Sequence, residues 1–439
     1  MKTKDNELME KIVSLCKRRG FVFQGSEIYG GLAGTWDYGP LGVALKNNVR
    51  DLWWKKFVTS REDMYGVDAS ILMNPKVWQA TGHVGGFSDP LVECTKCHMR
   101  FREDQLPDKN KCPDCKGVLG DARQFNMLFK TNVGAVEDET SISYLRPETA
   151  QGMFVNYKNI IDSFHPKLPF GMAQIGKAFR NEIAPRDFTF RSREFEQMEI
   201  EYLIKPDKWP DIFEHFRQEM LSWTKEIGLR PEHVYELEVS DTDRAFYSKR
   251  TIDFEFEFPF GRSELYGLAY RTDYDLKKHT ESSGVNLEYL DEETKEKFIP
   301  HCIEPSFGVD RTVLAILSDA YTEDKMNDEV RVYLKFVPNV APVKVAVFPL
   351  LKNRPVLIDK AKSIYQELKK EFGAVMFDDN GNVGKRYRRQ DEIGTPFCVT
   401  VDFDTIEKDN CVTVRDRDTG KQERIAVTKL IEYLKVKLS

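Results

Sequence analysis

The stretch from Gly171 to Leu203 carries charged side chains at every second position, and we expect chemistry there. Arg180 and Glu182 are two residues apart, and Gln197 and Glu199 repeat this spacing on a second arm. Side chains two residues apart point to the same face of a strand. The stretch therefore predicts two strands, each with one apolar and one charged face. Guanidinium groups, carboxylates and an aromatic ring on one exposed face favour an anionic, planar ligand.

Two cysteine pairs are the second group of residues that could do chemistry. Cys94 and Cys97 form one CxxC pair, and Cys112 and Cys115 form the other. Four thiolates with this spacing can close a tetrahedral zinc site that has no open position. We therefore predict one structural Zn²⁺ in a ribbon-like insert at residues 90–120, rather than four reduced surface thiols.

Several further elements are needed to position these groups. TIDFEFEF at 251–258 alternates acids with apolar residues and predicts an antiparallel strand, and ELYGLA at 264–269 predicts another. Residues 303–317 predict a strand that runs into a helix with Arg311 in its first turn. An arginine there opposes the helix dipole, so its position favours an anionic ligand. Residues 64–73 predict a further strand, ended by Pro75.

Composition limits the class of protein. The chain has 439 residues and 41% hydrophobic residues, enough for two or three domains. We see no apolar run of about 18 residues that could span a membrane, and the charged N-terminus does not resemble a secretory segment. We therefore expect a cytoplasmic protein. The net charge of −6 argues against indiscriminate nucleic-acid binding but allows a local basic surface.

The pattern changes after a proline-containing linker at 337–342. We expect one domain at 1–340 and a second at 341–439, where apolar strands alternate with a helix. This alternation predicts a small α/β domain with a largely parallel sheet. Within it, residues 385–389 combine four cations with one aromatic ring. By composition they form either a nucleic-acid patch or a solvated helix face.

Longer strings resemble a known family. FRNE at 179–182, REF at 193–195 and GVDR at 308–311 are similar to motifs 2 and 3 of class II aminoacyl-tRNA synthetases. YGGLAGTWDYGPLG, LRPETAQG, EFEQMEIEYL, RTDYDL and EPSFG resemble the homodimeric glycyl-tRNA synthetases, over essentially the whole chain.

The resemblance implies an α+β fold, with a six-stranded antiparallel sheet flanked by helices and a C-terminal α/β anticodon-binding domain. It implies ATP with Mg²⁺, glycine and tRNA(Gly) as ligands, glycine–tRNA ligation as the activity, and a homodimer. Many members of the family have no cysteine pairs at this place, so the zinc site depends on spacing alone.

The resemblance also implies the roles of individual residues. Arg180 and Arg311 would be catalytic, at the α-phosphate and the γ-phosphate. The residues that would bind ATP are Arg180, Asn181, Glu182, Phe190, Arg191, Ser192, Arg193, Glu194, Phe195, Glu264, Leu265, Gly308, Val309, Asp310 and Arg311. Those that would bind glycine are Arg102, Glu148, Phe195, Glu196, Gln197, Met198, Glu199, Glu304, Pro305, Ser306, Phe307 and Gly308.

Two other functions remain open on the sequence. One is a class II synthetase of the same subgroup, specific for threonine, proline or histidine. The other is a non-catalytic tRNA-binding paralogue. The presence of Arg180, Glu182 and Arg311 argues against the second, because such a paralogue should have lost a phosphate-binding arginine.

Overall fold

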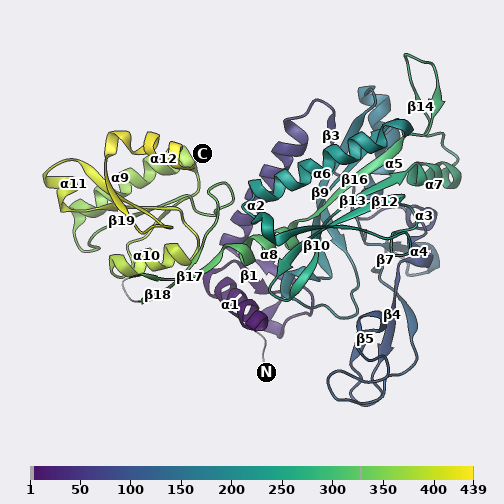
Figure 1. Cartoon of the computed structure of the whole chain (residues 1–439), viewed down its shortest axis with the longest axis horizontal. Helices are drawn as coiled ribbons and strands as arrows, with labels where there is room; N and C mark the ends of the chain where they lie inside the picture. The colour runs from purple at the N-terminus through teal and green to yellow at the C-terminus, as the bar shows by residue number, and fades with distance from the viewer. Residues whose placement is uncertain (1–3, 327–328, 439) are drawn as a thin grey trace.

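A seven-stranded sheet forms the centre of the computed structural model, which describes residues 4–326 and 329–438 (Figure 1). Six strands are antiparallel to their neighbours, as predicted, and a short seventh strand runs parallel to β9 at the edge. In spatial order the strands are β11 (Val234–Glu238), β12 (Arg250–Phe258), β13 (Gly261–Thr272), β16 (His301–Gly308), β10 (Glu194–Ile204), β9 (Phe170–Phe179) and β3 (Met64–Gly66).

Side chains along β10 alternate between the two faces of the sheet, and each face packs against its own layer of helices. Met198 and Ile200 lie in the main core, together with residues of α2, α6 and α8. Leu203 belongs to a second cluster with residues of α5 and α7. Glu199 and Glu201 share the face of Leu203, because side chains two residues apart point the same way. The helices are α2 (Pro40–Trp54), α5 (Ala150–Phe164), α6 (Trp209–Glu226), α7 (Tyr274–Ser283) and α8 (Val309–Ala320).

The predicted strand at 64–73 is only partly correct. β3 ends at Gly66, and Pro75 begins helix α3 (Pro75–Ala80) instead of ending a strand. The Asn74 side chain accepts a hydrogen bond from the Lys76 N–H at 3.0 Å. An asparagine cap followed by proline at the first helical position is a favoured start for a helix.

The insert extends away from the core as a three-stranded sheet (Figure 1). Its strands are β4 (Ser88–Glu93), β5 (Arg100–Arg102) and β6 (Arg123–Asn126). The short helix α4 (His83–Gly86) precedes it, and the hairpin of β7 (Lys130–Asn132) and β8 (Ile142–Tyr144) follows it. Two smaller pairs complete this part of the chain: β1 (Val22–Gln24) with β2 (Trp36–Tyr38), and β14 (Tyr289–Leu290) with β15 (Lys297–Phe298).

The C-terminal part contains a separate five-stranded sheet with its own apolar core. The prediction of a largely parallel sheet is wrong, because β19 is parallel to its two neighbours whereas β21, β22 and β23 pair antiparallel. Short connections permit antiparallel pairing, while parallel pairs need a crossover such as α9. The elements are β19 (Val345–Pro349), α9 (Pro355–Phe372), β20 (Val375–Phe377), α10 (Val383–Glu392), β21 (Phe397–Val401), α11 (Phe403–Glu407), β22 (Cys411–Asp416), β23 (Gln422–Ala426) and α12 (Leu430–Leu438).

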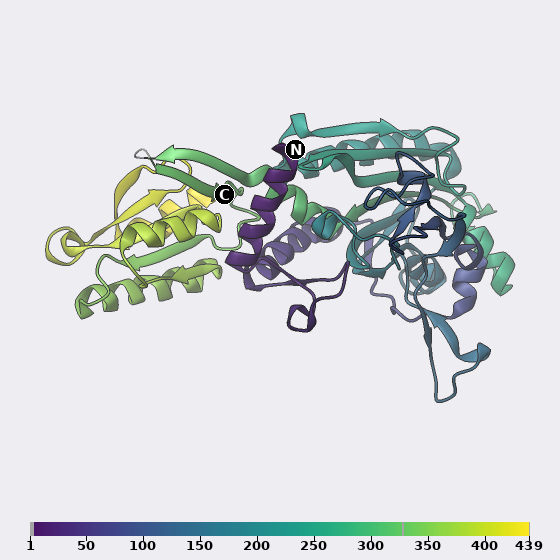
Figure 2. The same ribbon diagram turned by 90° about the horizontal axis from the view of Figure 1, so that it is seen from below.

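The two parts are joined by buried contacts. In the predicted linker, Val340 and Ala341 lie in the main core. The hairpin of β17 (Tyr321–Met326) and β18 (Glu329–Leu334) reaches the C-terminal part. There Arg331 donates to Asp391 of α10 at 3.4 Å and to the Arg417 carbonyl, just after β22, at 2.7 Å. Helix α1 (Lys4–Arg19) lies between the two parts (Figure 2), and its Arg19 pairs with Glu392 at 2.5 Å. The linker is therefore a packed connection.

The basic segment at 385–389 lies on α10 and is mostly committed to internal contacts. Arg386 is buried and donates to the carbonyls of Asp379 and Gly381, at 2.9 and 2.7 Å. Arg389 pairs with Asp378 at 2.7 Å. Arg386 and Arg389 thus stabilise the loop before the helix, whereas Lys385 and Arg388 are exposed, so the choice between a nucleic-acid patch and a solvated helix face now concerns these two cations.

Within the described ranges, 4–326 and 329–438, we find no helix that is both long enough and apolar enough to cross a membrane.

Candidate active site

A cavity of about 460 Å³ opens on the face of the sheet that carries Glu199. Strands β10, β12, β13 and β16 line it, together with the loop after β9, the start of α8 and the segment before β12. Most of the predicted site residues come together here, from parts of the chain far apart in sequence. Those that line the cavity are Arg102, Glu148, Arg180, Glu182, Phe190, Arg191, Ser192, Phe195, Glu196, Gln197, Glu199, Glu264, Leu265, Glu304, Ser306, Gly308, Asp310 and Arg311.

The other predicted residues are adjacent to the cavity but do not line it. Met198, Phe307 and Val309 belong to the main core, and Pro305 follows Glu304 along β16. Arg193 donates to the carbonyl of Ala33 at 2.8 Å, so it fixes a loop. The remaining two are Asn181, whose N–H donates to the Met127 carbonyl, and Glu194, which pairs with Lys177.

Three arginines form one end of the cavity. The Arg180 guanidinium lies 5.3 Å from the centre of the Phe195 ring. Arg311 donates to the Glu264 carbonyl at 3.0 Å and lies 4.4 Å from the Phe190 ring. Arg191 is 3.6 Å from the Glu182 carboxylate. Cations stacked on aromatic rings keep their remaining donors available, so this end suits a phosphate chain and a base.

Two acidic residues beside these arginines already bind other groups of the protein. Asp310 accepts from the Tyr38 hydroxyl at 2.6 Å and from the Glu196 N–H at 2.7 Å. The Glu196 carboxylate pairs with Lys46 and, at 3.2 Å, with Arg50. These contacts lock the start of α8 against β10 and thereby position Arg311.

Buried carboxylates form the other end. Glu199 accepts from Ser306 Oγ at 2.8 Å and from Gln197 Nε2 at 2.6 Å on one oxygen. Its second oxygen accepts from the Thr149 N–H at 3.1 Å and from the Thr149 hydroxyl. The four donors and the start of α5 at Thr149 favour the anion. Burial and the nearby Glu148 charge outweigh them, so the pKa of the Glu199 carboxyl is raised.

Glu304 and Glu148 complete the acidic end. Glu304 accepts from Arg271 Nη1 at 2.7 Å. Glu148 is 3.4 Å from His83 Nε2 and accepts from Gln151 at 3.1 Å. Burial opposes ionisation of Glu148, but His83, Arg271 and Gln151 outweigh it and lower the pKa of the carboxyl. An arrangement of this kind suits an ammonium group.

Comparison with known proteins identifies the family. Residues 129–320 match the tRNA synthetase class II core domain (G, H, P, S and T), and residues 344–437 match the anticodon binding domain. The chain is 52% identical to a glycine–tRNA ligase of Lachnospira eligens over 98% of each chain. It is 50% identical to that of Clostridium acetobutylicum, over 99% of this chain and 100% of the relative. The chain belongs to the glycine–tRNA ligase family.

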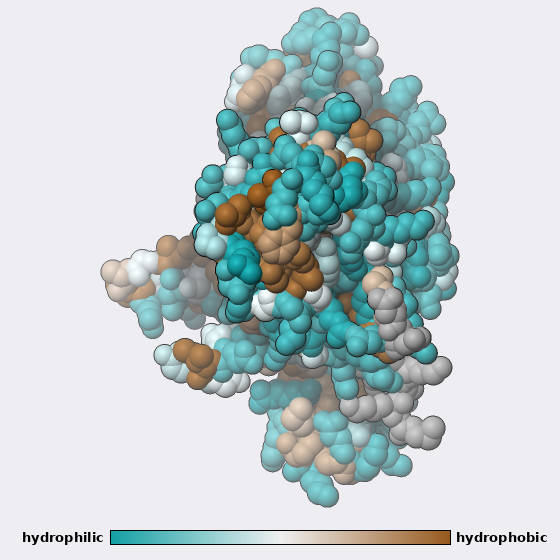
Figure 3. All heavy atoms as spheres, turned by 90° about the vertical axis from the view of Figure 1, so that its left-hand side faces the viewer, coloured by the Kyte–Doolittle hydropathy of each residue, from teal (hydrophilic) through white to brown (hydrophobic). Residues whose placement is uncertain are grey.

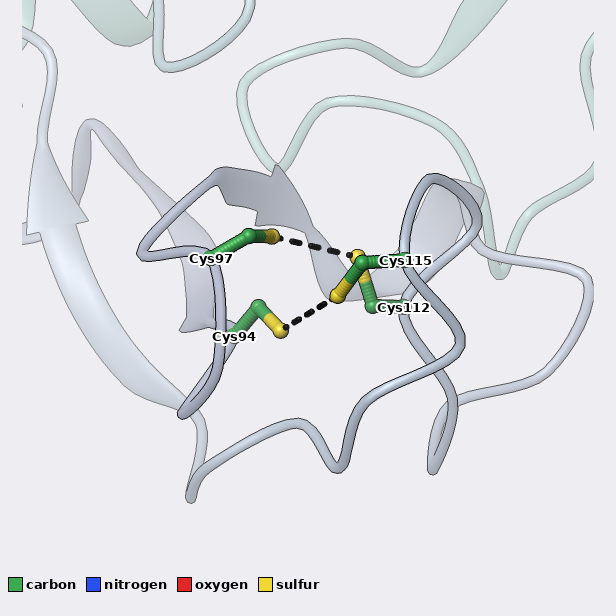
Figure 4. A group of neighbouring side chains, drawn as sticks. All are labelled: Cys94, Cys97, Cys112 and Cys115. Atoms are coloured by element: carbon green, nitrogen blue, oxygen red, sulfur yellow. Dashed lines mark hydrogen bonds between the residues drawn. The ribbon is translucent and has the colours of Figure 1, made fainter.

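The cysteine insert of this family member has the geometry of a metal site. Cys94 Sγ and Cys115 Sγ are 3.5 Å apart, and Cys97 Sγ and Cys112 Sγ are 3.7 Å apart (Figure 4). All four sulfurs lie within 4.8 Å of one another. Zn–S bonds of about 2.3 Å in a tetrahedron require sulfurs roughly 3.8 Å apart. The four residues therefore fit a closed metal site, whereas disulfides would need about 2.05 Å.

Arg102 connects the insert to the cavity. Its guanidinium is 2.7 Å from Asp89 and 2.7 Å from Asp104. Arg102 lines the cavity, but a substrate carboxylate would have to replace one of these two partners.

The family strings identified most of the cavity, but several contributing residues received no role from the sequence. Arg271 begins the string RTDYDL, and its buried guanidinium binds Asp275 and Glu304. Tyr247 lines the cavity and lies 3.9 Å above Arg271. Asp253 lies in the alternating strand β12, and its position on the charged face of that strand was the available signal.

Proposed function

We propose that this chain attaches glycine to tRNA in two ATP-dependent steps, through a glycyl-adenylate. The observation that carries the proposal is one cavity with arginines at one end and buried carboxylates at the other. Such a cavity suits two substrates that must meet, a nucleotide and an amino acid. The glycine carboxylate attacks the α-phosphorus and displaces pyrophosphate. The terminal ribose hydroxyl of the tRNA then attacks the glycyl carbonyl, and the bond from this carbonyl carbon to the phosphate oxygen breaks, which releases AMP.

At the phosphate end, Arg180 holds the α-phosphate beside the glycine carboxylate, and Arg311 holds the γ-phosphate. Phe195 stacks on the adenine ring, and Glu182 accepts from its amino group. No nucleophilic side chain is needed, because alignment and fixed positive charge lower the barrier to attack. Mg²⁺, when bound with ATP, neutralises further phosphate charge. Glu264 and Asp253 are the carboxylates of the cavity that suit a hard cation there.

At the acidic end, Glu148 and Glu304 bind the glycine ammonium together with Ser306. Glu199 joins them by exchanging one of its four internal donors for the ammonium; the donors whose residues line the cavity are Gln197 and Ser306. Glycine has no side chain to recognise, so larger amino acids are rejected by the carboxylates crowding its α-carbon.

An amino-acid-dependent ATP–pyrophosphate exchange assay tests the proposal. Exchange with glycine, and much weaker exchange with threonine, proline and histidine, is the expected result. Exchange with one of those three would give the chain a different specificity within the same subgroup. Exchange with no amino acid would favour a non-catalytic tRNA-binding role.

The metal of the insert is, in this proposal, one structural Zn²⁺ bound by Cys94, Cys97, Cys112 and Cys115. A zinc–thiolate site in place of disulfides also suits a reducing compartment, the cytoplasm. Metal analysis of protein purified under reducing conditions should find about one zinc per chain. Cys112→Ser should release it, and a metal-free wild type would contradict the assignment.

tRNA(Gly) and a second copy of the chain are the proposed macromolecular partners. Figure 3 faces the C-terminal domain and shows apolar side chains among mostly hydrophilic ones, a mixture that suits base stacking beside backbone contacts. Ile28 and Tyr29 are 90% and 87% exposed on a loop before α2, which supports burial in a dimer. Light scattering of the wild type and of Tyr29→Asp would test this, with a monomeric wild type as the contradicting result.

A further inference from the structure

A fourth carboxyl group lies beneath the acidic end of the cavity and has no part in the function proposed above. Glu201 has no exposed surface. Its Oε2 accepts a hydrogen bond from the Cys302 thiol at 3.0 Å. Its Oε1 has no hydrogen-bond partner in the part of the chain that the structure describes. A buried carboxylate without donors is strongly disfavoured.

The neighbouring carboxylates are far better supplied with donors. Glu199 accepts four hydrogen bonds, and Glu304 accepts from a guanidinium at 2.7 Å. Glu201 has only a thiol, which is a weak donor. Of these three groups, Glu201 is therefore the least able to carry a negative charge.

The register of the sheet adds a second reason. Glu199 pairs with Ser306 and Tyr202 pairs with Ile303, so Glu201 lies opposite Glu304 across β10 and β16. Like charges directly opposite destabilise a sheet. Arg271 is already shared between Asp275 and Glu304, so it compensates a further anion only in part. Burial raises the pKa of Glu201 well above its usual value; the Glu304 charge adds to this, and Arg271 and the thiol only partly oppose it.

We propose that Glu201 is a positioning residue that stays protonated and supports the Glu304 carboxylate from below. Its proton removes one negative charge from the row and thereby favours ionisation of Glu199 and Glu304 at the substrate, against the burial that raises the pKa of both carboxyl groups, that of Glu304 to about 8. The kinetic part of this inference depends on the proposed glycine site, whereas the protonation of Glu201 does not.

Infrared spectroscopy tests the protonation directly. At about pH 9, where ordinary carboxyl groups are ionised, the wild type should retain a carboxylic C=O stretching band. Glu201→Gln should lose this band, and the matched variant Glu304→Gln should keep it. A wild type without the band, or a band that survives in Glu201→Gln, would overturn the proposal, whatever the enzyme activity.

Kinetics of glycine-dependent exchange test the positioning role. Glu201→Ala should raise KM for glycine about tenfold with kcat nearly unchanged, because a void beside Glu304 lets its carboxylate move. Glu201→Gln, a neutral side chain of the same shape, should restore KM to within about threefold of the wild type.

If Glu201→Gln is as impaired as Glu304→Gln, the charge of Glu201 is needed and the proposal is wrong. An unchanged KM in Glu201→Ala would exclude a positioning role. A wild type with no glycine-dependent exchange would instead refute the proposed function, while the infrared result would still stand.

Discussion

The two ends of the cavity use charge in opposite ways. At the phosphate end, the Arg311 and Arg191 side chains remain 27% and 19% exposed, and their protein partners are carbonyls, aromatic rings and single carboxylates. At the acidic end, Arg271 and Glu304 are 2% and 9% exposed and belong to a connected network.

This difference shows where function and stability can be separated. Arg180 stacks on a ring and donates to a carbonyl, so its removal leaves no buried carboxylate without its partner. A buried ion pair cannot lose one partner without a large destabilisation. Substitution of Arg180 at the phosphate end should therefore affect catalysis alone, and substitutions at the acidic end should affect substrate affinity, folding or both.

The largest effect is expected from Arg180→Ala. This change removes the cation placed where phosphate and glycine carboxylate meet, so glycyl-adenylate formation should fall by about 10³-fold or more. The midpoint of chemical unfolding should hardly change, because Arg180 is only partly buried and donates to a single carbonyl, that of Pro147. Exchange kinetics and denaturation on the same preparation would measure both. Retained exchange would remove Arg180 from its proposed role.

Arg271→Ala should have the opposite profile. Asp275 and Glu304 would lose their shared cation inside the protein, so the free energy of unfolding should fall by about 3–5 kcal/mol. Urea denaturation would measure the loss. Arg180→Ala is the control, since it removes the same type of side chain from the same cavity. Equal stabilities for the two variants would contradict the distinction between the ends.

Glu304→Gln should affect glycine and spare ATP. Loss of one carboxylate charge at the ammonium should raise KM for glycine by about 10–100-fold, the effect of removing a charged hydrogen bond worth about 1.5–3 kcal/mol. KM for ATP should change less than about threefold, because the nucleotide contacts lie at the other end. Initial rates with each substrate varied in turn would measure both constants. A comparable rise in both KM values would show that the ends are not independent.

The sequence predicts these two ends unequally. The alternation predicted both strands, β9 and β10, because a period of two is a local property. It was wrong for Arg180 and Glu182, because β9 ends at Phe179 and both residues lie in the loop that follows. Two cysteine pairs likewise predict their own site, since spacing within one short insert is sufficient. The family strings supplied the residues around glycine, which come from three separate segments and which no local pattern could bring together.

Arg271 and Glu201 show why the remainder of the site was missed. Their roles depend on burial and on partners far away in sequence: Arg271 meets Glu304, and Glu201 meets Cys302. The basic segment at 385–389 was only partly described for the same reason, because composition does not reveal that Arg386 is buried among carbonyls while Lys385 and Arg388 are exposed. A proline can end a strand or begin a helix, and only the hydrogen bond to the capping Asn74 shows that Pro75 begins a helix.

The smallest effect is expected from Asp253→Asn, a change at the phosphate end that should alter how KM for ATP depends on pH. Burial, followed by the Glu264 and Glu255 charges, raises the pKa of Asp253 to about 7. A raised carboxyl pKa means that the folded protein binds this proton more tightly than the unfolded chain does. Its contribution to stability is therefore present at low pH and is lost as pH rises toward 7.

Binding of Mg²⁺ with ATP has the opposite dependence, because the cation needs the carboxylate. KM for ATP should rise as pH falls below 7, by at most about tenfold per unit, and Asp253→Asn should remove this dependence. Exchange rates between pH 6 and 8 would measure it. An unchanged pH dependence in Asp253→Asn would assign the titration to another group and leave Glu264 as the carboxylate nearest the phosphates.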